Sequence, residues 1–339
     1  MAKRRPTLAE IAGEAGVSVS TVSKVINGHI DVAADTRRQV ERLLEQHRYQ
    51  PRRHRGRRTV GLIDLVFLDL GSPWAMEILT GVEEVTHDAG FGIVVSAVHD
   101  RKRSRPGRKW LDNIQARHSD GVVLVLSELS TQQQAQLDAL GIPVVIVDPI
   151  GDPARGVPAV GAANWDGGLT ATEHLIAQGH RRIATIAGPA HVMCSRGRVD
   201  GYRSAMRNAD LPVLDGYVSH GDFMSGTGKE LTEALFELPE PPTAIFAGSD
   251  QMARGAYEAL HERGLKVPDD VSVVGFDDLP EARWAIPPLT TVRQPLRDMA
   301  QMATRMLIDL VGGDVPETTR VELATRLVER HSTSPPKEA

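Results

Sequence analysis

The chain has 339 residues, of which 41% are hydrophobic and 24% charged, enough to build two or three domains with buried cores. This balance excludes wholesale disorder, and aliphatic runs such as residues 122–126 are far shorter than the ~20 residues of a membrane span. The basic start leads into a polar segment, so we expect no secretory signal. The single cysteine, Cys194, excludes an internal disulfide. These features predict a soluble, cytoplasmic protein.

Charge is distributed unevenly along the chain. Residues 1–58 carry 13 Lys and Arg against 6 Asp and Glu, whereas the remainder carries 26 against 38. A basic head on an acidic body indicates that the head binds a polyanion and the body does not. A basic, solvated N-terminal tail is the alternative, and the helical patterning of the head argues against it.

The first fifty residues read as three short helices. Thr7 and Glu10 form a capping box for the first helix, Ser18 can cap the second, and the third runs from about 35 to 47. Their apolar stripes are Leu8, Ile11, Ala12 and Ala15, then Val19, Val22, Val25 and Ile26, then Val40, Leu43 and Leu44. Between the apolar positions of the second helix lie small polar or basic residues, which suit base edges and phosphates. The pattern predicts a helix-turn-helix; any three-helix bundle is the alternative.

Three stretches of this head carry a resemblance. TLAEIA at 7–12, AGVS at 15–18 and STVSKVIN at 20–27 resemble the headpiece of the LacI/GalR family of repressors. The resemblance implies that the second helix lies in the major groove. The DNA-contacting residues that it implies are Thr7, Ser18, Val19, Ser20, Thr21, Ser23, Lys24 and Asn27.

The segment after the headpiece departs from the family. Family members usually carry a hinge helix here, with a Leu that wedges into the minor groove, whereas residues 51–58 hold no Leu and look about five residues short. This hinge contains five arginines: Arg52, Arg53, Arg55, Arg57 and Arg58. Our hypothesis is that they form an electrostatic arm along phosphates or in a narrow minor groove. A disordered basic linker is the alternative.

From residue 59 onward, aliphatic segments alternate with amphipathic ones. Strands are expected at 60–67, 91–96, 121–126, 144–147, 183–187, 244–247 and 271–275. Helices are expected at 74–89, 131–140, 167–178, 198–209, 226–237, 250–263 and 297–311. This alternation predicts parallel sheets covered on both faces, with ligands beyond the carboxyl ends of the strands.

The body also resembles the LacI/GalR family. GHRRIA at 179–184, DDVSVVGFDD at 269–278 and PLTTV at 288–292 are typical of it. The resemblance implies an all-α headpiece followed by an α/β core of two lobes like periplasmic binding proteins, with two parallel sheets and three crossovers. The implied boundaries are 1–50 for the headpiece, 51–58 for the hinge, 59–331 for the core and 332–339 for a tail. Lobe one would hold 59–161 and 292–323, and lobe two 162–291 and 324–331.

Polar and aromatic residues gather at the expected strand ends, which suits a sugar. The effector-binding residues implied by the resemblance are Ser72, Trp74, Ser127, Asp166, Arg198, Phe223, Ser249 and Asp277. Arg198 and Asp277 would grip effector hydroxyls, and Phe223 would stack on the ring. Asp277 could instead be only a helix cap or turn former, and Trp74 a core residue.

Rival functions lack their motifs. There is no GxSxG or HExxH, the phosphate-loop-like residues 226–230 lack the first Gly and the Ser/Thr, and no metal-ligand spacing occurs. We therefore expect no catalytic residue, metal or cofactor. A non-regulatory solute or sugar receptor is the alternative, but it would need export and no helix-turn-helix.

The prediction is a homodimeric transcriptional repressor of carbohydrate genes, cytoplasmic and nucleoid-associated, with no membrane partner. It would bind near-palindromic double-stranded operator DNA and a mono- or oligosaccharide effector. Nucleoside and purine effectors, which the family also includes, stay open. So does the choice between inducer and co-repressor.

Overall fold

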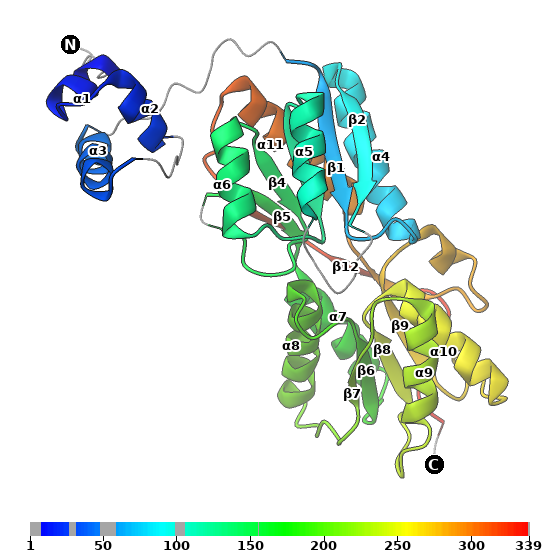
Figure 1. Ribbon diagram of the computed structural model, residues 1–339. Coiled ribbons are helices and arrows are strands. Elements are labelled where there is room, and N and C mark those ends of the chain that lie inside the picture. The colour runs from blue at the N-terminus through cyan, green and yellow to red at the C-terminus, as the bar shows by residue number, and fades with distance from the viewer. Residues whose placement is uncertain (1–7, 27–31, 48–58, 99–105, 155, 338–339) are drawn as a thin grey trace.

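The N-terminal region folds as three short helices around a small core. The computed structural model describes residues 8–26, 32–47, 59–98, 106–154 and 156–337. The helices are α1 (Leu8–Glu14), α2 (Val19–Ile26) and α3 (Ala34–Gln46) (Figure 1). Ile11, Val22 and Val40, one from each helix, are fully buried against one another. Val19 is 46% exposed, so our placing of it on the buried stripe of α2 was wrong.

The first lobe is built on a parallel six-stranded sheet with the strand order β11-β5-β4-β3-β1-β2. Its strands are β1 (Leu62–Phe67), β2 (Gly92–Ala97), β3 (Gly121–Val125), β4 (Val144–Val147), β5 (Ala159–Ala162) and β11 (Arg320–Leu323). Its helices are α4 (Pro73–Ala89), α5 (Arg108–Arg117), α6 (Thr131–Leu140) and α11 (Leu296–Gly312). Helices α4 and α11 cover one face of the sheet, and α5 and α6 cover the other.

The second lobe repeats this plan with the order β12-β10-β9-β8-β6-β7. Its strands are β6 (Ile183–Ala187), β7 (Val218–His220), β8 (Ala244–Ala247), β9 (Ser272–Asp277), β10 (Thr290–Arg293) and β12 (Arg326–Val328). Its helices are α7 (Asn164–Ala177), α8 (Met193–Asn208), α9 (Ser225–Leu235), α10 (Asp250–Glu262) and the short 3-10 helix η1 (Pro280–Arg283). Helices α7 and α8 cover one face, and α9 and α10 the other. Only β12 is antiparallel to its neighbour.

The chain passes between the lobes three times, as expected. It crosses from β5 to α7, from β10 to α11 and from β11 to β12 (Figure 1). Because β10 pairs with the second sheet as far as Arg293, that sheet extends two residues beyond the boundary at 291 that we expected. Ser332 is fully buried and its Oγ donates to the Val273 carbonyl at 2.6 Å, so part of the expected tail packs on the second lobe.

No helix in the described parts of the chain is both long and apolar enough to cross a membrane.

Candidate functional site

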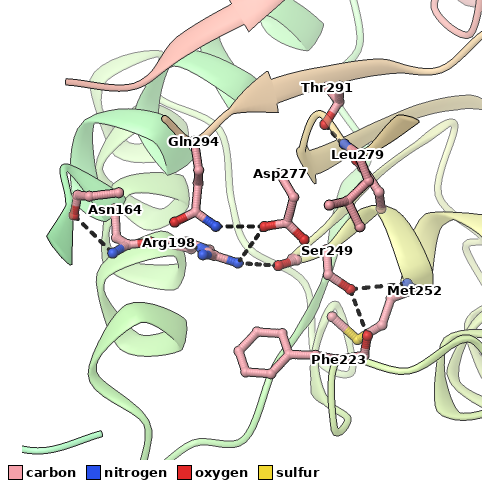
Figure 2. Close-up of polar contacts among 12 residues, drawn as sticks. Asn164, Arg198, Phe223, Ser249, Met252, Asp277, Leu279, Thr291 and Gln294 are labelled. Carbon is pink, nitrogen blue, oxygen red and sulfur yellow. Dashed lines mark hydrogen bonds and ion pairs between the residues drawn. The ribbon is translucent and has the colours of Figure 1, made fainter. Parts of the chain in front are cut away.

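Arg198 is the centre of a polar cluster at the junction of the lobes. Its side chain is buried on α8 (Figure 2). Its Nε donates to Asn164 Oδ1 at 2.9 Å, and its Nη1 donates to the Gly248 carbonyl at 2.5 Å. Nη1 also lies 3.9 Å from Asp277 Oδ1. The guanidinium is therefore fixed from three sides, in a place where a free charge would be costly.

Close packing of α7 on α8 brings Asn164 beside Arg198. A Cβ on Gly168 would lie 2.2 Å from the Arg198 carbonyl oxygen, and one on Gly201 would lie 2.2 Å from the Trp165 carbonyl oxygen. Both positions therefore require glycine. The two glycines let the helix backbones touch, and the first turn of α7 reaches the guanidinium as a result.

Two aromatic rings lie against the guanidinium. Its Cζ is 3.7 Å from the ring centroid of Phe276 and 5.7 Å from that of Phe223, within cation–π range. Phe223 has a φ of 69°, and its ring fills the place that a Cβ on Gly188 would take. Ser249 caps α10 by accepting from Met252 N at 3.0 Å, and it donates to the Phe223 carbonyl at 2.9 Å. Its hydroxyl thus ties the Phe223 loop to α10.

Asp277 is a buried carboxyl group at the end of β9. Its Oδ1 accepts from Gln294 Nε2 at 2.6 Å. Burial raises the pKa of Asp277 from 3.8 to about 7, although Arg198 and the hydrogen bond from Gln294 both act to lower it. Gln294 Oε1 is buried and has no hydrogen-bond partner among the described residues. The hydrogen-bonding capacity of the Asp277 carboxyl group therefore changes with pH. Gln294 Oε1 is an acceptor that no described residue satisfies.

The first lobe contributes a second buried carboxyl group. Asp148, directly after β4, has its pKa raised by burial, against the lowering effects of Arg198 and a hydrogen bond from Cys194. Burial also raises the pKa of the Cys194 thiol. Met193 N donates to the Ile150 carbonyl at 2.7 Å, so the two lobes are hydrogen-bonded to each other beside the cluster. The site is therefore shared by both lobes.

Of the predicted effector residues, Arg198, Phe223, Ser249 and Asp277 come together in this cluster (Figure 2). The other four predicted effector residues have other environments in the structure. Ser72 caps α4, the buried Ser127 donates to the Val125 carbonyl at 3.2 Å, and Asp166 is exposed on α7. Trp74 packs in the core of the first lobe, which is the alternative that we kept open. Their roles toward an effector remain predictions.

Sequence reasoning missed Asn164, Gln294 and Asp148. Each lies directly or closely after the carboxyl end of a strand. Because ligands of parallel sheets bind beyond these ends, an inspection of every strand end would have found them. Strands β5 and β10 were not predicted because their sequences, AVGA and TTVR, are not runs of large aliphatic residues, and Asp148 was overlooked although β4 was predicted.

The described part of the predicted DNA-binding surface lies on α2. Ser18 Oγ accepts from Thr21 N at 3.1 Å and so caps the helix, while the side chains of Val19 and Lys24 are exposed. Nothing is described of the side chains of Ser20 and Ser23. Outside the described residues lie Thr7, Asn27 and the five hinge arginines. The contacts of these residues with DNA remain predictions.

Within the described ranges, no group of three His, Cys, Asp or Glu side chains is placed to hold a metal ion.

Known proteins match both parts of the chain. The family model for "Bacterial regulatory proteins, lacI family" matches residues 7–52, and one for a "Periplasmic binding protein-like domain" matches residues 172–333. The HTH-type transcriptional regulator CelR of Thermobifida fusca is 35% identical, covering 97% of this chain and 99% of its own. The chain belongs to the lacI family of bacterial regulatory proteins.

Solved structures of lacI-family regulators agree with this fold. A transcriptional regulator CelR–cellobiose complex matches with a TM-score of 0.74 at 35% identity, covering 97% of this chain and 100% of its own. A lac repressor dimer bound to operator and the anti-inducer ONPF matches with a TM-score of 0.71 at 29% identity, covering 98% and 100%. The predicted fold class is confirmed, and so is the prediction of a helix-turn-helix transcriptional regulator rather than an enzyme.

Proposed function

We propose that this regulator is a repressor of carbohydrate uptake or catabolism genes, and that a neutral sugar bound around Arg198 and Asp277 changes its affinity for operator DNA. The observation that carries the proposal is the buried guanidinium, held at three points by second-lobe residues beside Phe223, with Asp148 of the first lobe close to it. Planar donors and acceptors pair with vicinal hydroxyls, and a ring face packs on sugar C–H groups.

The relatives support this ligand class. The CelR structure contains cellobiose, and its chain is similar to this one along nearly the whole length. The cluster holds one guanidinium, and the acidic groups Asp148 and Asp277 both lie close enough to interact with it electrostatically. An uncharged polyol therefore suits the site better than a phosphorylated sugar.

The proposed mechanism is a change of headpiece spacing. Because the cluster belongs to both lobes, a sugar there would alter the angle between them and so move the two headpieces of a dimer. Coupling of ~1–3 kcal/mol between two such sites gives a change of about 5–150-fold in operator affinity. The protein would then work in the cytoplasm, on the nucleoid.

The first experiment is selection of bound duplexes from a random DNA pool with the full-length protein. We expect a two-fold-symmetric motif, which cellobiose or another neutral sugar from a panel then releases or retains. Release identifies an inducer and tighter binding a co-repressor. Enrichment of no motif would contradict sequence-specific repression, whereas a motif that no sugar affects would contradict only the effector class.

The hinge arginines are tested separately. Changing Arg55, Arg57 and Arg58 together to Ala should weaken operator binding and lower the salt slope by up to about 5, because the dimer loses six arginines and each phosphate contact contributes ~0.9. The matched control changes Arg101, Lys102 and Arg103 to Ala, a basic run that we expect to be solvated. If affinity and its salt slope are the same for both triple variants, the arm does not exist.

Exposed apolar side chains support a homodimer. Ile286 is 92% exposed and Trp284 77%, next to a cavity of about 310 Å³ that Trp284 lines together with Tyr257 and Leu289. Met76 on α4 is 56% exposed, and α4 lies on the same side of the molecule as the segment after β9 (Figure 1). Such a surface suits an isologous interface with a second copy.

Ile286→Glu is expected to weaken the dimer by ~2–3 kcal/mol, about 30- to 150-fold, since it buries a charge against an apolar partner. Sedimentation velocity over a concentration series measures this change. The control is Val315→Glu, at a side chain that is 73% exposed after α11. A dimer equally strong in both variants would place the interface elsewhere.

A further inference from the structure

Asp277 and Asp278 form a turn that most residues avoid. Their φ angles are 122° and 58°, both in the region that favours glycine. Two successive aspartates stay in such a conformation only when neighbouring groups hold them there. The carboxyl group of Asp277 belongs to the cluster around Arg198, so whatever holds the turn also places that group.

The Asp278 carboxylate bridges two guanidinium groups. Its Oδ2 accepts from Arg293 Nε at 2.6 Å and also pairs with Arg293 Nη2. Its Oδ1 accepts from Arg330 Nη2, while Arg330 Nη1 donates to the Leu289 carbonyl at 2.7 Å. The Asp278 side chain is 1% exposed, so both of its oxygens are occupied inside the protein. Asp278 itself does not contact Arg198 in any described interaction.

These two arginines come from the segments that join the lobes. Arg293 is the last residue of β10, lies opposite Asp277 in the sheet and precedes the crossing into α11. Arg330 follows β12, which the chain enters after its third crossing. The Asp278 carboxylate is therefore bound by residues that lie close to two of the crossings about which the lobes would move.

Three further hydrogen bonds hold the same turn. Gln294, the next residue after Arg293, donates from Nε2 to Asp277 Oδ1 and from its backbone N to the Asp277 carbonyl at 3.3 Å. On the other side, the backbone N of Leu279 donates to Asp250 Oδ2 at 2.8 Å. The turn is thus held by residues at the end of β10, after β12 and at the start of α10.

We propose that Asp278, Arg293 and Arg330 are positioning residues: they hold the Asp277 carboxyl group in place for the effector and couple it to two of the three interlobe crossings. The proposal rests on the proposed function. The planar guanidinium fork matters here as well as its charge, because a lysine cannot pair with one carboxylate oxygen through two nitrogens.

The test uses variants that keep the charge. Arg293→Lys and Arg330→Lys retain the cation but lose the fork. Arg117→Lys is the matched control: Arg117 and Arg293 are 32% and 31% exposed, and each pairs with a buried carboxylate, Asp64 or Asp278. Arg117 lies in the first lobe, on α5, away from the cluster.

The first readout is calorimetric titration of the full-length proteins with cellobiose. We expect Arg293→Lys and Arg330→Lys to bind it at least about tenfold more weakly than wild type, whereas Arg117→Lys stays within about twofold. Operator binding without sugar should be kept by all three variants. Equal cellobiose affinity in all four proteins would overturn the proposal.

The second readout needs no effector. It is the pH dependence of the free energy of unfolding, to which the Asp277 carboxyl group contributes up to its pKa of about 7. The titratable groups facing Asp277 include Arg198, Asp148, Asp250 and Cys194, and all three variants keep them. Loss of the guanidinium fork should let the turn relax and expose the Asp277 carboxyl group to water, which lowers its pKa. The pH above which the stability curve levels off should therefore be lower in Arg293→Lys and Arg330→Lys than in wild type. Arg117→Lys should give a curve parallel to wild type.

Parallel curves in all variants would mean that the cluster is only structural, and would overturn the proposal. A wild-type protein that fails to bind cellobiose or any sugar of the panel would contradict the proposed effector class. The pH profile alone then decides whether these residues position Asp277.

Discussion

Arg198→Ala is expected to abolish the response of operator binding to sugar while leaving sugar-free operator binding intact. The guanidinium is buried and contacts Asn164, Gly248 and Asp277, so truncation removes the cation at the centre of the cluster and leaves Asn164 Oδ1 and the Gly248 carbonyl without their donor. Loss of one member of a buried, hydrogen-bonded charge pair costs ~2–5 kcal/mol, which is about 30-fold or more in effector affinity. Calorimetry with the sugar that acts on wild type measures the affinity, and gel shift measures the response.

The matched control for this variant is Arg203→Ala. Arg203 lies on the same helix, and its side chain is 52% exposed and pairs with Asp200 at 3.8 Å. Because exposed pairs contribute little, we expect wild-type affinity and response. An Arg198→Ala protein that still released or retained its operator on sugar addition would remove the central residue of the proposed site.

The long buried elements could be predicted because their side chains leave little choice. Val122, Val123 and Leu124 are fully buried in β3, and such a run on both faces of a sheet reads as a parallel strand. By contrast, β11 (RVEL) and β12 (RLV) mix charged and apolar residues over only four and three positions, too few for a period to be recognised. Helix α5 was not predicted either, and the residue at its N-cap position is Gly107, which offers no side-chain cap.

The site could be predicted only in part from the sequence. Residue type and family resemblance point to Arg198 and Asp277, but neither indicates the way a side chain turns. Trp74 is an aromatic residue near a strand end, yet its indole packs among Ile78, Leu279 and Met299 in the first-lobe core. Asn164 and Gln294 become visible only when the crossings bring the ends of β5 and β10 to the same place.

Asp277→Asn is expected to flatten the pH dependence of stability. The pKa of this carboxyl group is about 7 in the folded protein against an ordinary 3.8, so the folded state binds its proton more tightly than the unfolded state does. Its contribution to stability is therefore fully present below about pH 4 and is lost as the pH rises toward 7. The loss amounts to a few kcal/mol at most, because a pKa that differs by one between the folded and unfolded states corresponds to ~1.4 kcal/mol.

Asparagine has the shape of the protonated acid and can still accept from Gln294, but it cannot lose a proton. Urea unfolding at pH 5, 6, 7 and 8 should therefore show a shallower fall in the free energy of unfolding for Asp277→Asn than for wild type. Some slope should remain, because burial also raises the pKa values of Asp148 and Asp250. The control is Asp166→Asn, at an exposed carboxylate of the same lobe, which should follow the wild-type curve. If Asp277→Asn followed it as well, Asp277 would be ionised throughout this range, and the cluster would carry one more negative charge at neutral pH than the structure implies.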